Sequence, residues 1–415
     1  MKPISSAAVV GALLGALCAG AALAQLAWMQ GHSLGMLLLV PVGWALFKRH
    51  SHAFTFMLGY YVATTWPIAA GAGNFSHGTE LHLVLLAGWL ASCALAATPW
   101  WLAHMGFDRG GSVGAAAFAA MQLLLLYTPL LLINIAPPLL GWGSVLGGFG
   151  EFGILAGIGL WSLIIARARQ IPTSRAAASA AVALCAAFVL SIRDEPQLKL
   201  GPQIYAASVR WDEPGRHGAD EVIDRIAKIG SAVRRVSQVQ PDIRTVVWPE
   251  GVLGDLLGRI NTPFAVEVGA ASRDLDMQVL VGVDELLPSG ERRVGALIQN
   301  PDGSQVVRYA RQPMPVSLWR PWRQATYSAD WSRDATFDLR SGGVGMLSFC
   351  WEDLLPGLHI AALRRRSDTT VIVSIANDWW MADDSGALRQ GKAIEAVAKL
   401  YGLPLVRAVN LPAPR

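Results

Sequence analysis

The residues whose types are best suited to catalysis lie around one cysteine, in the segment SFCWEDLLP at positions 348–356. Cys350 follows an apolar, strand-like run (GVGMLSF), and the acidic pair Glu352 and Asp353 follows it after one tryptophan. A cysteine that attacks a carbonyl group needs a base, a cation or hydrogen-bond donors for the developing oxyanion, and access to substrate. The alternative interpretation is a buried cysteine that only fills space.

Other segments supply the groups that such a cysteine would need. Glu250 follows TVVWP and can be the base, because a carboxyl group in an apolar pocket has a raised pKa. Arg311 follows another strand-like run and can supply a fixed positive charge, which Glu352 can orient. Taken singly, these residues could be a surface glutamate, a salt-bridge arginine and a helix-capping carboxylate. The histidines of the C-terminal half, His217 and His359, do not follow strands, which disfavours a Cys/His dyad.

Strands and helices alternate around these residues from position 204 onward. Apolar, β-branched strands joined by amphipathic helices indicate sheets with helices packed on their faces, and PDGS at 301–304 predicts an antiparallel hairpin. Ligand sites in such folds lie at the carboxyl ends of strands, where Glu250, Cys350 and the pair Asn377 and Asp378 are expected. The predicted strands are IYAASVR, TVVWPE, MQVLVGVDE, RVGALIQN, QVVRYARQ, GVGMLSF, TTVIVSIAND and PLVRAVN, and the predicted helices cover 219–238, 264–275, 354–366 and 387–401.

The first half of the chain is far more apolar than the second half. Of the 415 residues, 53% are hydrophobic and only 15% are charged, and the apolar excess lies before about residue 195. We therefore predict a transmembrane domain over 1–195 and a polar domain over 196–415. Seven spans, most of them near the ~20 residues that cross a bilayer, are predicted at 5–28, 33–47, 53–72, 82–103, 113–134, 150–166 and 176–192.

The basic residues of the short loops predict the orientation of these spans. Lysines and arginines fall on alternate connections: at 2, at 48 and 49, at 109, and at 167, 169 and 175. The positive-inside rule then places the N-terminus in the cytoplasm and the polar domain in the periplasm of a multi-pass bacterial inner-membrane protein. A signal peptide cleaved near residues 22–24 is an alternative for the first span, and it would leave the later orientation unchanged.

The charge and the cysteines narrow the possible functions. Because many basic residues set the topology, the net charge of +4 gives no reason to expect direct nucleic-acid binding. The triplet at 364–366 fits a helix end, with contact to anionic lipid as the alternative. Cys18, Cys93 and Cys185 lie in predicted spans, so Cys350 is the only thiol of the polar domain. An unpaired thiol in an oxidising compartment indicates a function. We expect no cofactor and no metal.

These residues carry a resemblance to a known family. The polar half resembles the nitrilase, or carbon-nitrogen hydrolase, superfamily, which has a Glu, Lys and Cys triad on an αββα fold. The whole chain resembles the apolipoprotein N-acyltransferases and, more closely, the TraB family of plasmid conjugal-transfer proteins. The motifs that carry the resemblance are TVVWPEG, YARQPMPVSLWRPW, LSFCWEDLLP, SIANDWW and KAIEAVAKLYGLPLVRAVN.

The resemblance implies a role for each matching residue. Glu250 would be the general base, Arg311 would occupy the place of the lysine, and Cys350 would form a thioester with an acyl chain. The accessory residues implied in the same way are Glu352, Asn377, Asp378 and Trp380. The family's acyl donor is a membrane phospholipid and its acceptor is a lipoprotein amine.

Three departures separate this chain from the acyltransferases. Arginine replaces lysine at 311, PVSL replaces Pro-Phe-Gly-Glu at 315–318, and the sequence ends soon after RAVN, which predicts a C-terminally short domain. Two hypotheses follow: an acyltransferase acting in conjugal transfer, or a non-catalytic component of mating or pilus assembly that binds lipid or protein. An amidase acting on a small amide is a third, which the membrane half disfavours.

Overall fold

The computed structural model describes residues 6–29, 34–75, 79–128, 132–169, 203–211, 219–254, 261–315, 317–322 and 327–413. The chain forms two compact units. The first is made of 1–197 with 355–357 and 395–402, and the second of 198–354, 358–394 and 403–415. The predicted span at 176–192 and the predicted boundary at 195 lie outside the described residues.

The first unit is helical in its described part. Three helical stretches are long and apolar enough to cross a membrane: Ser6–Trp28, Leu83–Arg109 and Gly150–Ala168. Two shorter apolar stretches cover Leu34–Leu46 and Gly111–Tyr127, so the prediction of seven spans is not confirmed. The elements are α1 (Ser6–Trp28), η1 (Leu34–Leu39), α2 (Val40–Leu46), α3 (His50–Phe75), α4 (Thr79–His104), η2 (Met105–Arg109), α5 (Gly111–Tyr127), η4 (Pro138–Ser144) and α6 (Gly150–Ala168).

Two glycines allow α1 and α3 to pack closely. A Cβ atom at Gly20 would lie 1.9 Å from the Phe56 carbonyl oxygen, and one at Gly59 would lie 2.1 Å from the Leu17 carbonyl oxygen. Helices pack in membranes mainly through van der Waals contact, which small residues at the crossing make possible. The α1–α3 crossing has this form.

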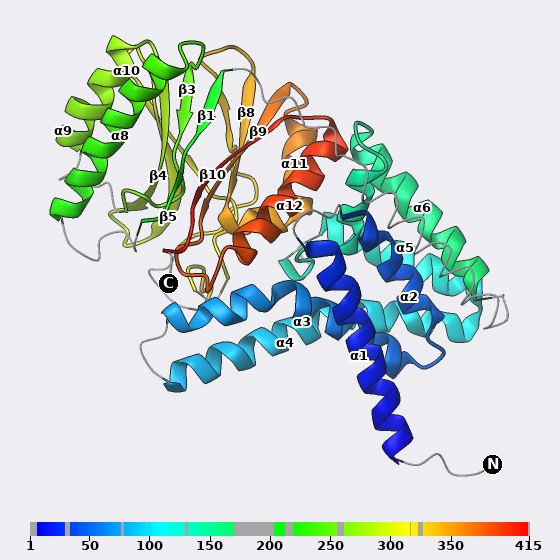
Figure 1. The fold of residues 1–415 in the computed structure, drawn as a ribbon. Coiled ribbons are helices and arrows are strands. Elements are labelled where there is room, and N and C mark those ends of the chain that lie inside the picture. The colour runs from blue at the N-terminus through cyan, green and yellow to red at the C-terminus, as the bar shows by residue number, and fades with distance from the viewer. Residues whose placement is uncertain are drawn as a thin grey trace, which may run out of the picture. The chain divides into compact units, whose positions relative to one another are not determined.

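The second unit contains two five-stranded sheets (Figure 1). The first has the order β1-β3-β4-β5-β6, in which β4, β5 and β6 are antiparallel, and the second has the order β2-β10-β9-β8-β7, parallel except for β7. The strands of the first sheet are β1 (Ile204–Ala206), β3 (Thr245–Val247), β4 (Gln278–Leu286), β5 (Arg292–Gln299) and β6 (Gln305–Tyr309). Those of the second are β2 (Ser208–Val209), β7 (Thr336–Asp338), β8 (Val344–Phe349), β9 (Thr369–Asn377) and β10 (Leu405–Asn410).

Most predicted strands are present, with two differences. The segment IYAASVR forms two short strands rather than one: β1 pairs with β3 in the first sheet, and β2 pairs with β10 in the second. Strand β7 was not predicted, because its three residues are too few to form an alternating pattern. The predicted hairpin at 301–304 is confirmed, since it joins the antiparallel strands β5 and β6.

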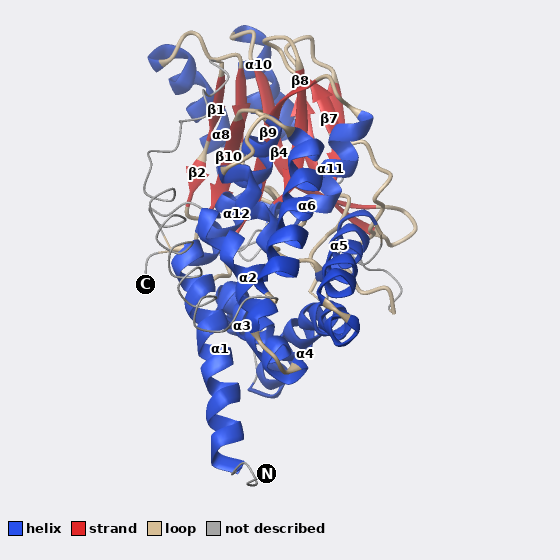
Figure 2. Cartoon of the chain, turned by 90° about the vertical axis from the view of Figure 1, so that its right-hand side faces the viewer, coloured by secondary structure: helices blue, strands red, loops and turns tan. Residues whose placement is uncertain are grey.

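Helices cover the outer face of each sheet, which gives four layers in the order helix, sheet, sheet, helix. Figures 1 and 2 show α11 and α12 beside the second sheet, and Figure 1 shows α8, α9 and α10 beside the first. This is the predicted αββα arrangement. The helices are α8 (Ala219–Val239), α9 (Asn261–Phe264), the π-helical η5 (Ala265–Gly269), α10 (Ala270–Asp274), η6 (Cys350–Leu354), α11 (Pro356–Arg365) and α12 (Ser385–Tyr401).

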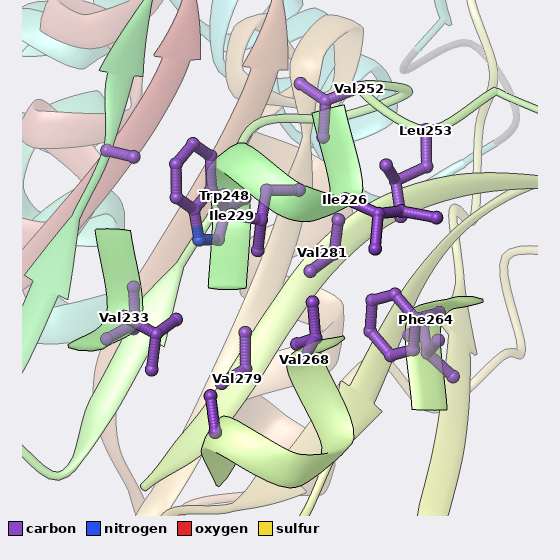
Figure 3. Packing of buried hydrophobic residues seen from close by; sticks show 14 of the residues in the cluster. Ile226, Ile229, Val233, Trp248, Val252, Leu253, Phe264, Val268, Val279 and Val281 are labelled. Carbon is purple, nitrogen blue, oxygen red and sulfur yellow. The ribbon is translucent and has the colours of Figure 1, made fainter. Parts of the chain in front are cut away.

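Apolar clusters hold these layers together. Alternate residues of the facing strands, among them Val294, Ala296 and Ile298 of β5, fill the space between the sheets. On the outer face of the first sheet, α8 packs a stripe of buried residues against β3 and β4 (Figure 3). The helical spacing of three and four residues puts these side chains on one face. They are Val222, Ile226, Ile229, Val233 and Val236.

The α8 stripe should be a main source of stability in the second unit. Ile229 is fully buried, so Ile229→Ala is expected to lower the free energy of unfolding by about 2–5 kcal/mol through lost burial and a residual cavity. Ile223 lies on the same helix and is 47% exposed, so Ile223→Ala should change it by less than about 0.5 kcal/mol. Denaturant unfolding of both variants in detergent tests this, and equal effects would contradict the packing described.

Candidate functional site

Cys350 lies at the turn where β8 ends and η6 begins. Its backbone φ is +37°, in the left-handed region that residues other than glycine rarely adopt. Such strain persists only where the surroundings enforce it, and it is concentrated at functional sites. The partly buried thiol lies 3.9 Å from Asp378 Oδ1 and 4.0 Å from the Asn377 carbonyl oxygen, while the Gln390 amide nitrogen lies 3.8 Å from Sγ.

Glu250 is held by a loop that lies along β4 after β3 has ended. The Trp248 amide donates to the Leu280 carbonyl oxygen at 2.8 Å, and the Gly282 amide donates to the Pro249 carbonyl oxygen at 3.2 Å. A Cβ atom at Gly282 would lie 2.3 Å from Glu250 Cα, so only glycine permits this approach. The position of Glu250 therefore depends on a backbone contact that is visible only in three dimensions.

Glu250 and Cys350 each affect the pKa of the other. Glu250 is 8% exposed, and within the described residues its Oε2 atom has no hydrogen-bond partner. Burial raises the pKa of Glu250 well above its usual range, Asp284 and Asp378 raise it further, and a hydrogen bond with Cys350 opposes the shift. Burial, then Glu250 and Asp378, raise the pKa of the Cys350 thiol. Both groups therefore favour their neutral forms, and the free carboxyl oxygen is available to exchange a proton.

Arg311 occupies a separate buried position. Its Nη2 and Nε atoms donate to Glu352 Oε2 at 2.7 and 3.2 Å, and Nη1 donates to the Leu358 carbonyl oxygen at 3.0 Å. Glu352 Oε1 also accepts from the backbone amides of Arg311 and Gln312. Both side chains are fully buried. Among the described residues, no hydrogen bond or ion pair joins Arg311 to Glu250 or Cys350, so the structure pairs Glu250 with Cys350 and Arg311 with Glu352.

His359 supports this second pair. Its Nδ1 atom lies 3.3 Å from Arg311 Nη2 and accepts from it, so Nε2 carries the proton and donates to the Glu352 carbonyl oxygen at 2.8 Å. Burial, with a further contribution from Arg311, lowers the pKa of His359 to about 3. The imidazole is therefore neutral near pH 7 and acts as a structural bridge.

The remaining predicted site residues lie at the end of β9, where Asn377 is the last residue, and in the segment that follows it. Trp380 Nε1 donates to the Asn377 carbonyl oxygen at 3.1 Å, and Asn410 Nδ2 donates to Asn377 Oδ1 at 2.9 Å. Asp378 is fully buried beside Cys350, and burial raises its pKa to about 6 although the Arg407 guanidinium opposes the shift. Asn377 and Asp378 thus lie next to the thiol, and Trp380 and Asn410 bind Asn377.

Asn410 was not predicted as a site residue, and neither were three further residues around the thiol: Asp353, Gln390 and Arg407. Asp353 is fully buried and accepts hydrogen bonds from Ser348 at 2.5 Å and from Ser374 at 2.8 Å. Nothing in the helical pattern of α12 distinguishes Gln390, whereas the arginine within RAVN could have been noticed as a charge inside an apolar strand. Within the described ranges, no group of three or more His, Cys, Asp or Glu side chains could hold a metal ion.

Comparisons with known proteins support the predicted resemblance. No family model matches the chain. The chain is 26% identical over 393 residues to a conjugal transfer protein TraB of Agrobacterium fabrum, covering 90% of this chain and 86% of that protein. It is 23% identical over 386 residues to a probable conjugal transfer protein TraB of Sinorhizobium fredii, covering 91% and 92%. The resemblance to TraB proteins is thereby confirmed.

Solved structures with some likeness to the chain come from the nitrilase superfamily. An amidase from Nesterenkonia sp. has 14% identity and a TM-score of 0.38 over 50% of this chain and 74% of its own. A carbon-nitrogen hydrolase from Helicobacter pylori has 14% identity and a TM-score of 0.41, covering 51% and 75%. Nit3 of Saccharomyces cerevisiae has 13% identity and a TM-score of 0.40, covering 51% and 76%.

Replacing Gly282 should displace Glu250. The Cβ atom of Gly282→Ala would overlap the backbone of Pro249 and Glu250, so we expect a loss of about 1–3 kcal/mol of stability. Because Glu250 raises the pKa of the Cys350 thiol, its displacement should also make the alkylation of Cys350 faster. Gly269→Ala is the matched control, because its nearest neighbour would lie 3.7 Å away. Thermal unfolding and thiol alkylation of both variants test the prediction, and a Gly282→Ala protein that behaves like the control would contradict it.

The burial of Glu250 predicts a pH-dependent stability. Above its ordinary pKa of 4.5, the unfolded chain releases a proton that the folded chain retains, so this group destabilises the fold increasingly as pH rises toward the folded-state pKa. Glu250→Gln removes this cost. Its stability relative to the unmodified chain should therefore increase with pH, by up to about 1.4 kcal/mol per unit.

Denaturant unfolding over a range of pH measures the difference. Glu267→Gln is the control, because the Glu267 side chain is 43% exposed and the substitution removes no buried carboxyl group. A constant difference between Glu250→Gln and the unmodified chain at every pH would contradict the assigned burial.

Proposed function

We propose that the chain is a membrane-bound acyltransferase of conjugal plasmid transfer, with Cys350 as nucleophile and Glu250 as general base. The observation that carries the proposal is the placement of a thiol at a strained strand end against a buried carboxyl group, one oxygen of which has no hydrogen-bond partner among the described residues. The names of the two relatives support the association with conjugal transfer.

The first half-reaction forms an acyl-enzyme. The ionised fraction of Glu250 takes the Cys350 proton, and the thiolate attacks the ester carbonyl carbon of a phospholipid. The tetrahedral intermediate then collapses: the bond to the lipid alcohol breaks, and that alcohol leaves with the proton held by Glu250. A thioester on Cys350 and a lysophospholipid result.

The second half-reaction transfers the acyl group to an amine. The amine attacks the thioester carbonyl carbon, Glu250 takes a proton from the attacking nitrogen, and the thiolate leaves and recovers that proton. An amide product and the free thiol result. A lipoprotein or a pilus-assembly protein is the proposed acceptor.

The apolar helices give a reason for this choice of donor. Three helical stretches are suited to a bilayer, and a phospholipid remains in the bilayer whereas a small amide does not. We place the protein in the bacterial inner membrane as a multi-pass chain, with its N-terminus in the cytoplasm and the two-sheet unit in the periplasm. The loop charges support this orientation.

One observation favours a second function. The donors of Arg311 are directed to Glu352, His359 and backbone carbonyl groups, so the residue in the place of the family lysine has a structural position. A domain that no longer turns over could still bind lipid or pilus-assembly proteins. In that case, Cys350 would be dispensable although the chain is required.

Mass spectrometry of Cys350 after incubation with phospholipid vesicles separates the two functions. The acyltransferase should gain an acyl increment on the Cys350 peptide, and Cys350→Ser should gain none. In a mating assay, Cys350→Ala should reduce plasmid transfer by at least about 100-fold. Cys93→Ala, which removes a buried thiol of the helical unit, is the control and should retain both properties. An unacylated Cys350, together with normal transfer by Cys350→Ala, would leave the binding function.

A further inference from the structure

Gln390 of α12 places an amide donor at the thiol. Its Nε2 atom lies 3.8 Å from Cys350 Sγ, and the Gln390 side chain is almost completely buried. On the other side of the amide, Arg407 Nη2 donates to Gln390 Oε1 at 3.3 Å. Because a guanidinium group can only donate, the amide oxygen must face Arg407 and the NH₂ group must face the thiol. The orientation of the amide is therefore determined by chemistry.

Arg407 is itself held in place by two buried carboxylates. Its Nη2 atom lies 3.4 Å from Asp378 Oδ2, and its Nε atom lies 3.7 Å from Asp353 Oδ2. The two serine hydroxyls that donate to Asp353 fix that carboxylate in turn. This chain of contacts runs from β8 and β9 through β10 to α12 and ends at the thiol.

The thiol needs such a donor because its other neighbours oppose ionisation. The charged or titratable groups that face it are Glu250 from the loop after β3, Asp378 from the end of β9 and Asp353 from η6, all of them acids. Arg311 is directed elsewhere, to Glu352. Gln390 is the side-chain N–H donor near the thiol in the described part of the chain, and Arg407 supplies the positive charge behind it.

We propose that Gln390 is a catalytic donor that stabilises the Cys350 thiolate, and that Arg407 is the positioning residue that orients it. The inference deepens the proposed acyl transfer and rests on it for the identity of the nucleophile. Gln390 offsets the negative charge that develops on sulfur when the thiol loses its proton. It does so again when the thioester breaks and the sulfur leaves.

The test measures the rate at which iodoacetamide alkylates Cys350 across the pH range in which the thiol titrates. The full chain is used in lipid nanodiscs, and the Cys350 peptide is quantified by mass spectrometry. In Gln390→Leu, loss of a hydrogen bond to a charged sulfur should raise the midpoint by about one pH unit, which slows alkylation about tenfold below the midpoint. The plateau rate at high pH should be unchanged.

Two further variants and one control complete the test. Gln390→Glu keeps the shape of the side chain but adds a negative charge, so its midpoint should rise further. Arg407→Lys retains the charge without the fork geometry and should raise the midpoint by a smaller amount. Gln305→Leu makes the same substitution at the exposed first residue of β6 and should leave the profile unchanged. Thermal unfolding identifies any variant that fails to fold, and Gln390→Leu leaves the ion pairs of Arg407 in place.

Each outcome supports or overturns the inference. A Gln390→Leu profile identical to that of the unmodified chain, or one slowed equally at every pH including the plateau, would overturn it, because a steric effect lowers the plateau as well. Since iodoacetamide is not an acyl donor, the result is independent of acyl transfer. A shifted midpoint without a phospholipid adduct would retain the donor role and remove the acyltransferase. An adduct with an unshifted midpoint would do the reverse.

Discussion

The candidate site depends on the buried ion pair between Arg311 and Glu352. Neither side chain is exposed, and a charge in the protein interior is tolerated only when its hydrogen-bonding groups are satisfied. Glu352 accepts from two guanidinium nitrogens and from two backbone amides, all of them from Arg311 and Gln312. Because Glu352 follows Cys350 by two residues, the pair connects the end of β6 in the first sheet to the turn that presents the thiol. Loss of either partner would release this turn.

Because Arg311 pairs with Glu352, it does not pair with the acidic groups around the thiol. The acids Glu250, Asp353 and Asp378 surround Cys350, and the pKa of each is raised by burial, to about 6 for the two aspartates. Arg407 is the arginine that opposes the shifts of both aspartates. Near neutral pH the site can therefore hold one or more protons, and its reactivity is determined by where those protons lie.

Much of the fold could be predicted from sequence because it follows from periodicity. The stripe of α8, the hairpin at 301–304 and the placement of Glu250, Cys350 and Asp378 after strands all come from local patterns. A pattern identifies the buried face but not which polar groups meet there. Arg311 and Glu352 are 41 residues apart, and Gln390 and Cys350 are 40 apart, so only the tertiary fold brings them together. The division of IYAASVR between two sheets was hidden for a related reason, since its apolar pattern is continuous.

The proposed base, Glu250, and the proposed nucleophile, Cys350, come from different sheets. Glu250 follows β3 of the first sheet, and Cys350 follows β8 of the second. The residues that end these strands, Val247 and Phe349, belong to the core between the sheets. A packed interior has a low compressibility. The thickness of that core therefore determines the separation between the Glu250 carboxyl group and the Cys350 thiol. The strained backbone at Cys350 and the close approach at Gly282 fix each group on its own sheet, and the core between the sheets determines the distance of the proposed proton transfer.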